Sequence, residues 1–143
     1  MTDHLIRIFP RLAGVEHRIT SPQTSDYNCI AWAARITNRN WWPAPGYYWP
    51  KGIPRENTPE RFIEAFALHG YAVCDSPAHE EGYEKVALYL SNSGKPLHMA
   101  RQLPNGLWSS KLGWLEDIDH ETPEALEGSD YGRASIFLKR PRV

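Results

Sequence analysis

Cys29 is the residue whose neighbours best suit it to act as a nucleophile. It stands in YNCIAWA (residues 27–33), after the polar, turn-forming segment 20–26. This pattern predicts a short helix that begins here, with Asp26 or Asn28 as its N-cap. Free backbone N–H groups and the helix dipole in a first turn favour a thiolate, and they can lower a thiol pKa from about 8.5 to roughly 3.5–7.5. A small buried hydrophobic role for Cys29 is the alternative.

A cysteine nucleophile needs a base, and six histidines compete for that role. His98 differs from the others because it lies on a predicted strand over residues 96–103, which is rigid enough to aim an imidazole. Strand alternation places His98 and the small Ala100 on one face, so we expect the helix carrying Cys29 to approach there. His120, which has acidic neighbours, is the second candidate base. A purely structural His98 is the alternative.

The remaining pattern predicts an α+β fold over residues 1–143 as one domain. Residues 58–68 form the clearest helix, with Thr58 as N-cap, Pro59 at its first position and Gly70 after its end. We expect strands at residues 5–9, 71–74, 85–90, 96–103, 107–112 and 134–139. We expect an extended arm at 10–28, a polar connection at 116–120 and a helical turn at 122–128.

An aromatic loop is predicted over residues 41–50, where three prolines and a glycine exclude regular structure. Its rings either seal the core or wall a substrate cleft beside Cys29. The candidate substrate-binding aromatic residues are Trp32, Trp42 and Trp49. Arg101 and Lys111 lie on predicted strands near the site, where they either bind an acidic substrate group or are solvated.

Composition narrows the class of protein. The chain has 143 residues and a net charge of −1, so we expect neither nucleic acid nor a membrane as the partner. The two cysteines have no spacing typical of a disulfide framework or a zinc site, and no cofactor or metal is expected. The first residues lack the apolar run of a signal peptide. We therefore expect a cytoplasmic protein, or one exported by a route that needs no signal.

Two resemblances extend this interpretation. The chain resembles an uncharacterised bacterial family marked by YNCIAWA (27–33), a Trp/Pro-rich loop, HMARQL (98–103), SKLG (110–113) and a final LEG–YG segment. The order of parts also resembles the papain-like cysteine hydrolases, in which a glutamine lies six residues before a cysteine that opens a helix. Gln23 precedes Cys29 by six residues, and His98 matches the histidine on a later strand.

The papain-like resemblance implies a thiol hydrolase acting on a peptide, protein or small amide, as a peptidase, amidase or deamidase. His98 would take the thiol proton, and Cys29 would form an acyl-enzyme. Gln23 and the Cys29 N–H would stabilise the oxyanion. The family's third residue, an asparagine, is absent. Ser110 occupies roughly its place, and Asp117 or Asp119 is the alternative.

Two other functions compete with this one. A catalytically silent papain-like module would keep the fold and bind a ligand on an aromatic platform. A bacterial toxin or effector domain would use the same chemistry in another setting.

Overall fold

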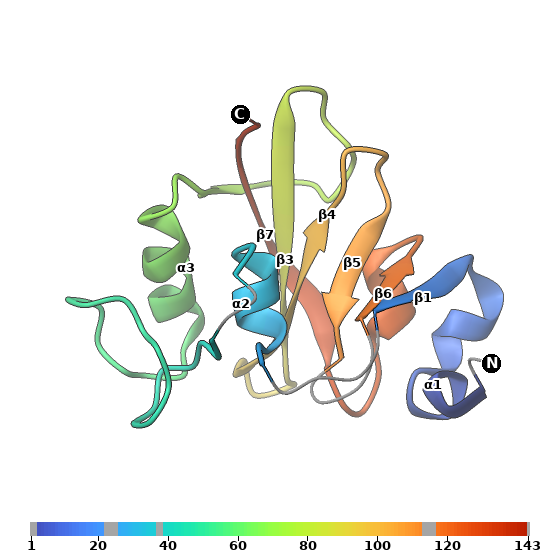
Figure 1. Cartoon of the computed structure of the whole chain (residues 1–143), viewed down its shortest axis with the longest axis horizontal. Coiled ribbons are helices and arrows are strands. Elements are labelled where there is room, and N and C mark those ends of the chain that lie inside the picture. Colours follow the sequence, from blue (N-terminus) through green and yellow to red (C-terminus); the bar gives the residue numbers. More distant parts are fainter. Residues whose placement is uncertain (1–2, 22–25, 37–38, 113–116, 143) are drawn as a thin grey trace.

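Seven antiparallel strands form one sheet in the order β1-β6-β5-β4-β3-β7-β2. The structure is a computed structural model, and it describes residues 3–21, 26–36, 39–112 and 117–142 (Figure 1). The strands are β1 (His17–Ser21), β2 (Ala72–Cys74), β3 (Tyr83–Leu90), β4 (Pro96–Gln102), β5 (Trp108–Lys111), β6 (Asp117–His120) and β7 (Arg133–Pro141). The helices are α1 (Asp3–Ile8), η1 (Pro10–Gly14), α2 (Cys29–Ala33), α3 (Pro59–Ala67) and η2 (Pro123–Leu126).

The centre of the sheet is a meander of two tight connections. Gly94 in the β3–β4 turn and Gly106 in the β4–β5 turn have φ values of 84° and 90°, which a glycine adopts without strain. β7 then returns to pair with the other edge of β3, so that Val86 faces Leu138. The expected strands around residues 85–90, 96–103 and 107–112 are therefore confirmed, and the α+β class with them.

Helices cover both faces of this sheet. α2 packs on β4 and β5, and its cluster includes Cys29, Val86, Leu88 and Met99. On the other face, α1, η1 and η2 pack with Ala87, Tyr89 and Ala100, as the alternation of strand side chains requires (Figure 1). The face covered by α2 is called the α2 face below, and the other the far face. Because both faces are covered, β4 is almost continuously buried.

Three sequence expectations about elements are wrong. The expected strand over residues 5–9 is helix α1, in which Phe9 N–H donates to Leu5 O at 2.7 Å and both side chains are buried. The expected polar connection over residues 116–120 contains strand β6, and the expected arm over residues 10–28 contains η1 and β1. β6 is stabilised by pairing with β1, which lies far from it in sequence, and with β5, so local composition does not reveal it.

In the described parts of the chain, no helix is both long enough and apolar enough to cross a membrane.

Candidate functional site

Cys29 is the first residue of α2, as the sequence predicted. Asn28 is the N-cap: its Oδ1 accepts from the Ala31 N–H at 3.0 Å. The same side chain also holds the start of the aromatic loop, because Oδ1 accepts from Trp41 N–H at 3.1 Å and Nδ2 donates to Trp41 O at 2.6 Å. Asn28 thus joins the cysteine helix to the aromatic loop. The N-cap pattern identified Asn28, but nothing local revealed its bonds to Trp41.

The Cys29 thiol is buried between α2 and the sheet. Burial raises its pKa to about 11, although backbone N–H groups of Met99, Ile30 and Cys29 itself and the charge of Lys111 act in the opposite direction. The Met99 N–H is on β4, whose described ladder with β5 consists of Arg101↔Ser109 and Gln102↔Trp108. The thiol therefore lies beside the part of β4 that precedes these two pairs. In this environment Cys29 is a neutral thiol at physiological pH.

Buried charged groups lie beside the thiol on the α2 face. Lys111 is 0% exposed, and it faces Asp117 across the β5–β6 pair. Its ammonium lies 5.8 Å from the centroid of the Tyr27 ring, and the Tyr27 hydroxyl donates to Asp117 Oδ2. The interpretation of Lys111 as a solvated strand residue is thus wrong. A fully buried lysine is uncommon, which makes this group chemically conspicuous.

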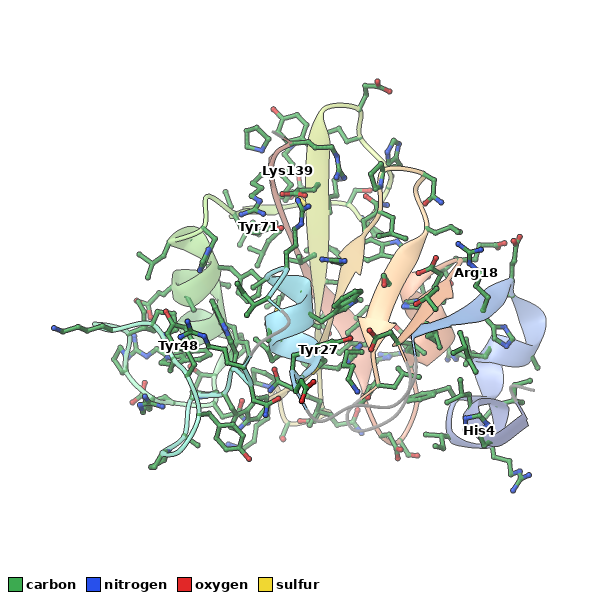
Figure 2. The ribbon with its side chains drawn as sticks, viewed as in Figure 1. His4, Arg18, Tyr27, Tyr48, Tyr71 and Lys139 are labelled. Carbon is green, nitrogen blue, oxygen red and sulfur yellow. The ribbon has the colours of Figure 1, made fainter. Side chains whose placement is uncertain are left out.

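Two aromatic rings continue from this group along the helix. Tyr27 stacks on Trp32 with ring centroids 5.5 Å apart, and Trp32 Nε1 donates to Ser109 Oγ at 3.1 Å. The Arg101 guanidinium lies over the Trp32 ring, 3.9 Å from its centroid, and Arg101 Nη1 donates to Trp32 O at 3.5 Å. Trp32 and Arg101, two of the candidate substrate contacts, therefore touch each other. Figure 2 shows Tyr27 at the centre of the molecule, between α2 and β5.

His98 lies on the far face of the sheet. Its ring stacks on Tyr131 with centroids 4.0 Å apart, and it meets Tyr89 edge to face. Its Nε2 contacts Ser110 Oγ at 3.1 Å, and Ser110 Oγ contacts His120 Nε2 at 2.8 Å. Ser110 is thus the close partner of His98 that the strand pairing predicted. Burial lowers the pKa of His98 well below its usual value, so the imidazole is neutral.

The expectation that Cys29 faces His98 is not met by a hydrogen bond, although Tyr131, whose ring stacks on His98, is close enough to the Cys29 thiol for the two to interact electrostatically. His98 and Ala100 do share a face, but α2 packs on the face that carries Met99. No described hydrogen bond joins the thiol to the imidazole. Asp117, by contrast, lies on the α2 face, and Asp119 accepts from Arg18 Nη2 at 3.5 Å. Neither aspartate has a described hydrogen bond to His98. Gln23 lies outside the described residues.

The aromatic loop is partly packed and partly exposed. Trp41 and Trp49 are buried, and Trp42 and Trp49 meet Phe62 of α3 edge to face. Trp49 Nε1 also donates to Pro54 O at 3.2 Å, so its role here is structural. Tyr47 and Tyr48 are 47% and 37% exposed. The packed rings thus match one expected behaviour, sealing the core, and the exposed rings are tyrosines rather than the tryptophans singled out from the sequence.

No metal centre emerges from the side chains. Within the described ranges, no group of three or more His, Cys, Asp or Glu side chains could hold a metal ion.

The fold and the site define an α+β protein with a buried thiol and a buried lysine on one face of its sheet. On the other face, two neutral histidines are joined by hydrogen bonds through a serine hydroxyl. The chain belongs to the family described as Domain of unknown function (DUF7689), which matches residues 18–139. That match contains every strand residue of the site described above. Comparison with curated proteins found no match, and neither did comparison with solved structures.

Proposed function

We propose that this chain is a papain-like module that binds a peptide or protein ligand without covalent catalysis by Cys29. The papain-like arrangement is supported by the order of parts: a helix that begins at a cysteine packs on an antiparallel sheet that carries a later histidine. The environment of the Cys29 thiol is the observation that supports a role without catalysis. Its pKa is raised to about 11, and the histidine that should activate it lies on the other face.

The proposed binding surface is the aromatic loop at residues 41–50. Arg55 Nη1 donates to Ala44 O at 2.7 Å and to Tyr47 O at 3.0 Å, and Asn28 holds Trp41. These bonds hold the loop in one conformation while Tyr47 and Tyr48 remain exposed. A pre-ordered loop loses little conformational freedom on binding, and tyrosines are enriched in protein interfaces.

Thiol labelling tests the absence of catalysis. Iodoacetamide labelling, followed by intact mass from pH 7 to 10, is measured in Cys74→Ser, in which Cys29 is the only thiol. We expect labelling at pH 8 to be at least about a hundredfold slower than in the urea-unfolded chain, because a thiol pKa near 11 leaves little thiolate. The Cys29→Ser variant, which keeps only Cys74, checks that the reagent is active. Rapid labelling of Cys29 with an apparent pKa below about 8.5 would contradict the proposal.

Peptide selection tests the binding surface. Peptides selected by phage display on the whole chain should bind Tyr47→Ser and Tyr48→Ser at least tenfold more weakly. Leu68→Ser is the matched control, because Leu68 is also an exposed large apolar residue but lies at the end of α3. Selected peptides that bind all three variants equally well would place the ligand elsewhere and overturn this part of the proposal.

A thiol hydrolase is the second candidate function, and the buried Lys111 favours it. The charge of Lys111 acts to lower the pKa of the Cys29 thiol, as a catalytic cysteine requires. In this alternative, Cys29 attacks the carbonyl carbon of an amide, the amine leaves with a proton, and water hydrolyses the thioester. Incubation with p-nitrophenyl acetate distinguishes the two functions. A rapid gain of one acetyl group on Cys29 supports the hydrolase, and an unmodified thiol supports the binding module.

A further inference from the structure

A second site lies at the end of the sheet near the C-terminus. It is a pocket of about 400 Å³. Its lining residues are Arg35, His69, Gly70, Glu84, Arg140 and Pro141. The pocket thus combines the residue after the α2 helix end, the turn between α3 and β2, and the ends of β3 and β7. Figure 2 shows Tyr71 and Lys139 in this upper part of the molecule.

Three guanidinium groups converge on one carboxylate in this region. Glu84, whose side chain is 7% exposed, accepts from Arg35 Nη1 at 3.3 Å, from Arg142 Nη1 at 3.4 Å and from Arg140 Nε. Arg140 also donates to His69 O at 2.7 Å and covers the Tyr71 ring at 4.5 Å. These contacts fix the guanidinium of Arg140 at the back of the pocket.

The cluster has more positive charge than Glu84 neutralises. Three arginines and one glutamate leave two positive charges in excess, from the groups that bond Glu84. Arg101 adds to this excess of positive charge. Burial is the main cause that lowers the pKa of Arg101, and the nearby charge of Arg35 lowers it further. The buried Nε of Arg101 has no described hydrogen-bond partner. A phosphate monoester carries about two negative charges at neutral pH, and arginine binds phosphate in a bidentate geometry.

Arg35 is the residue best placed to reach a ligand. Its side chain is 56% exposed, and the one described hydrogen bond of its guanidinium is to Glu84, so further N–H donors of this group are left for a ligand. Its backbone has φ 67°, a left-handed conformation that a side-chain-bearing residue rarely adopts. A glycine would fit this backbone better, yet the chain places an arginine here.

We propose that this pocket binds a phosphate dianion, either as free phosphate or as the phosphate group of a small monoester, through Arg35 and Arg140, which line it. Arg142 does not line the pocket and adds positive charge through its contact with Glu84. The phosphate oxygens would accept from the remaining donors of Arg35 and Arg140, and His69 and Pro141 would contact the remainder of a monoester. This site shares no residue with the thiol site, and it meets the aromatic loop where the His69 ring contacts Trp41, with centroids 5.4 Å apart. The arginines that carry the proposal lie outside that loop, so the proposal is tested separately from the proposed function.

The test is calorimetric titration of the whole chain with phenyl phosphate, inorganic phosphate and phenyl sulfate, with ³¹P line broadening as a second measurement. We expect phosphate binding to weaken at least tenfold in Arg35→Gly and in Arg142→Gln. Arg35→Gly suits the left-handed backbone, so loss of binding there is not a loss of folding, which thermal unfolding verifies. Arg7→Gln is the matched control, because Arg7 is exposed on α1, on the other side of the molecule (Figure 1).

Glu84→Gln distinguishes a phosphate-binding cluster from one with a purely structural role. Removing the carboxylate that competes for the arginines should tighten phosphate binding severalfold. Phenyl phosphate binding tighter than inorganic phosphate identifies a monoester as the source, and equal affinities identify free phosphate. Both results support a dianion site. The proposal is overturned if neither phosphate binds at millimolar concentration, if phenyl sulfate binds as tightly, or if Arg7→Gln weakens binding as much as Arg35→Gly.

Discussion

His98 donates from Nε2 to the hydroxyl of Ser110, 3.1 Å away, on the face of the sheet opposite Cys29. The direction of this bond follows from the next contacts. His120 Nδ1 donates to the Thr122 carbonyl at 2.8 Å, so the neutral His120 must accept at Nε2 from the Ser110 hydroxyl. Ser110 is then left to accept from His98. This series of hydrogen bonds fixes the tautomers of both histidines and leaves His98 Nδ1 as a buried acceptor without a described partner.

Ser110→Ala should destabilise the protein without changing the thiol. It removes the hydroxyl that both imidazoles use, and a buried polar group left without its partner costs about 1–3 kcal/mol. Urea unfolding measures this loss, with Ser135→Ala as the control because Ser135 is exposed. The rate of Cys29 alkylation should stay unchanged, since Ser110 lies on the far face. A change in that rate together with unchanged stability would show that Ser110 acts on the thiol after all.

Stability should fall on mild acidification because His120 is buried in its neutral form. Burial lowers its pKa from the usual 6.5 to about 4, so the unfolded chain binds more protons between these values. This contribution is therefore complete above pH 6.5 and is lost as the pH falls toward 4. Between pH 7.5 and 5 we expect His120 to contribute a loss of about 2 kcal/mol in the free energy of unfolding, in addition to a loss of the same sign from the buried His98.

The control for this pH dependence is a second histidine. His120→Gln should reduce the dependence measured by urea unfolding at each pH to the part that the buried, neutral His98 contributes, whereas His79→Gln, in an exposed loop, should leave it unchanged. Equal pH profiles for all three proteins would contradict a buried neutral His120.

Asn28→Ala should loosen both the cysteine helix and the aromatic loop. The change removes the N-cap bond to Ala31 and both bonds to Trp41. An N-cap is worth about 1 kcal/mol and an orphaned buried backbone group about 1–3 kcal/mol, so we expect a total loss of about 2–4 kcal/mol.

Limited proteolysis should show faster cleavage within residues 41–50 in Asn28→Ala than in the unchanged chain. Asn105→Ala is the control, because Asn105 makes one side-chain bond in an exposed turn, to Leu107 N–H. Unchanged proteolysis in Asn28→Ala would mean that the loop does not depend on Asn28.

Lys111→Met should make Cys29 even less reactive. The charge of Lys111 acts to lower the thiol pKa, so its removal raises that pKa further and slows iodoacetamide labelling at pH 9–10 in the Cys74→Ser background. Lys85→Met is the matched control: Lys85 is also buried, but it donates to Ser76 O elsewhere on the sheet. Equal labelling rates in the two variants would remove Lys111 from the thiol site.

Local sequence determined those helices and turns whose ends are set by capping residues, prolines or glycines within the element itself. Thr58, Pro59 and Gly70 mark the ends of α3, although the Thr58 side chain makes no capping bond, and Asn28 caps α2. The turn glycines at 94 and 106 set the connections of the β3–β4–β5 meander. In each case the cause is backbone conformation or hydrogen bonding within a few residues, which composition records directly.

Tertiary structure alone decided which residues meet Cys29. Alternation shows that His98 and Ala100 share a face, but it does not show which face α2 covers. Because β4 is buried on both faces, its sequence contains no polar side to indicate the answer. β6 likewise forms by pairing with β1, about a hundred residues earlier in the chain. Lys111 is buried only because α2 and the ring of Tyr27, which precedes α2, lie over β5. The site around Cys29 therefore depends on packing between distant segments, which local patterns do not specify.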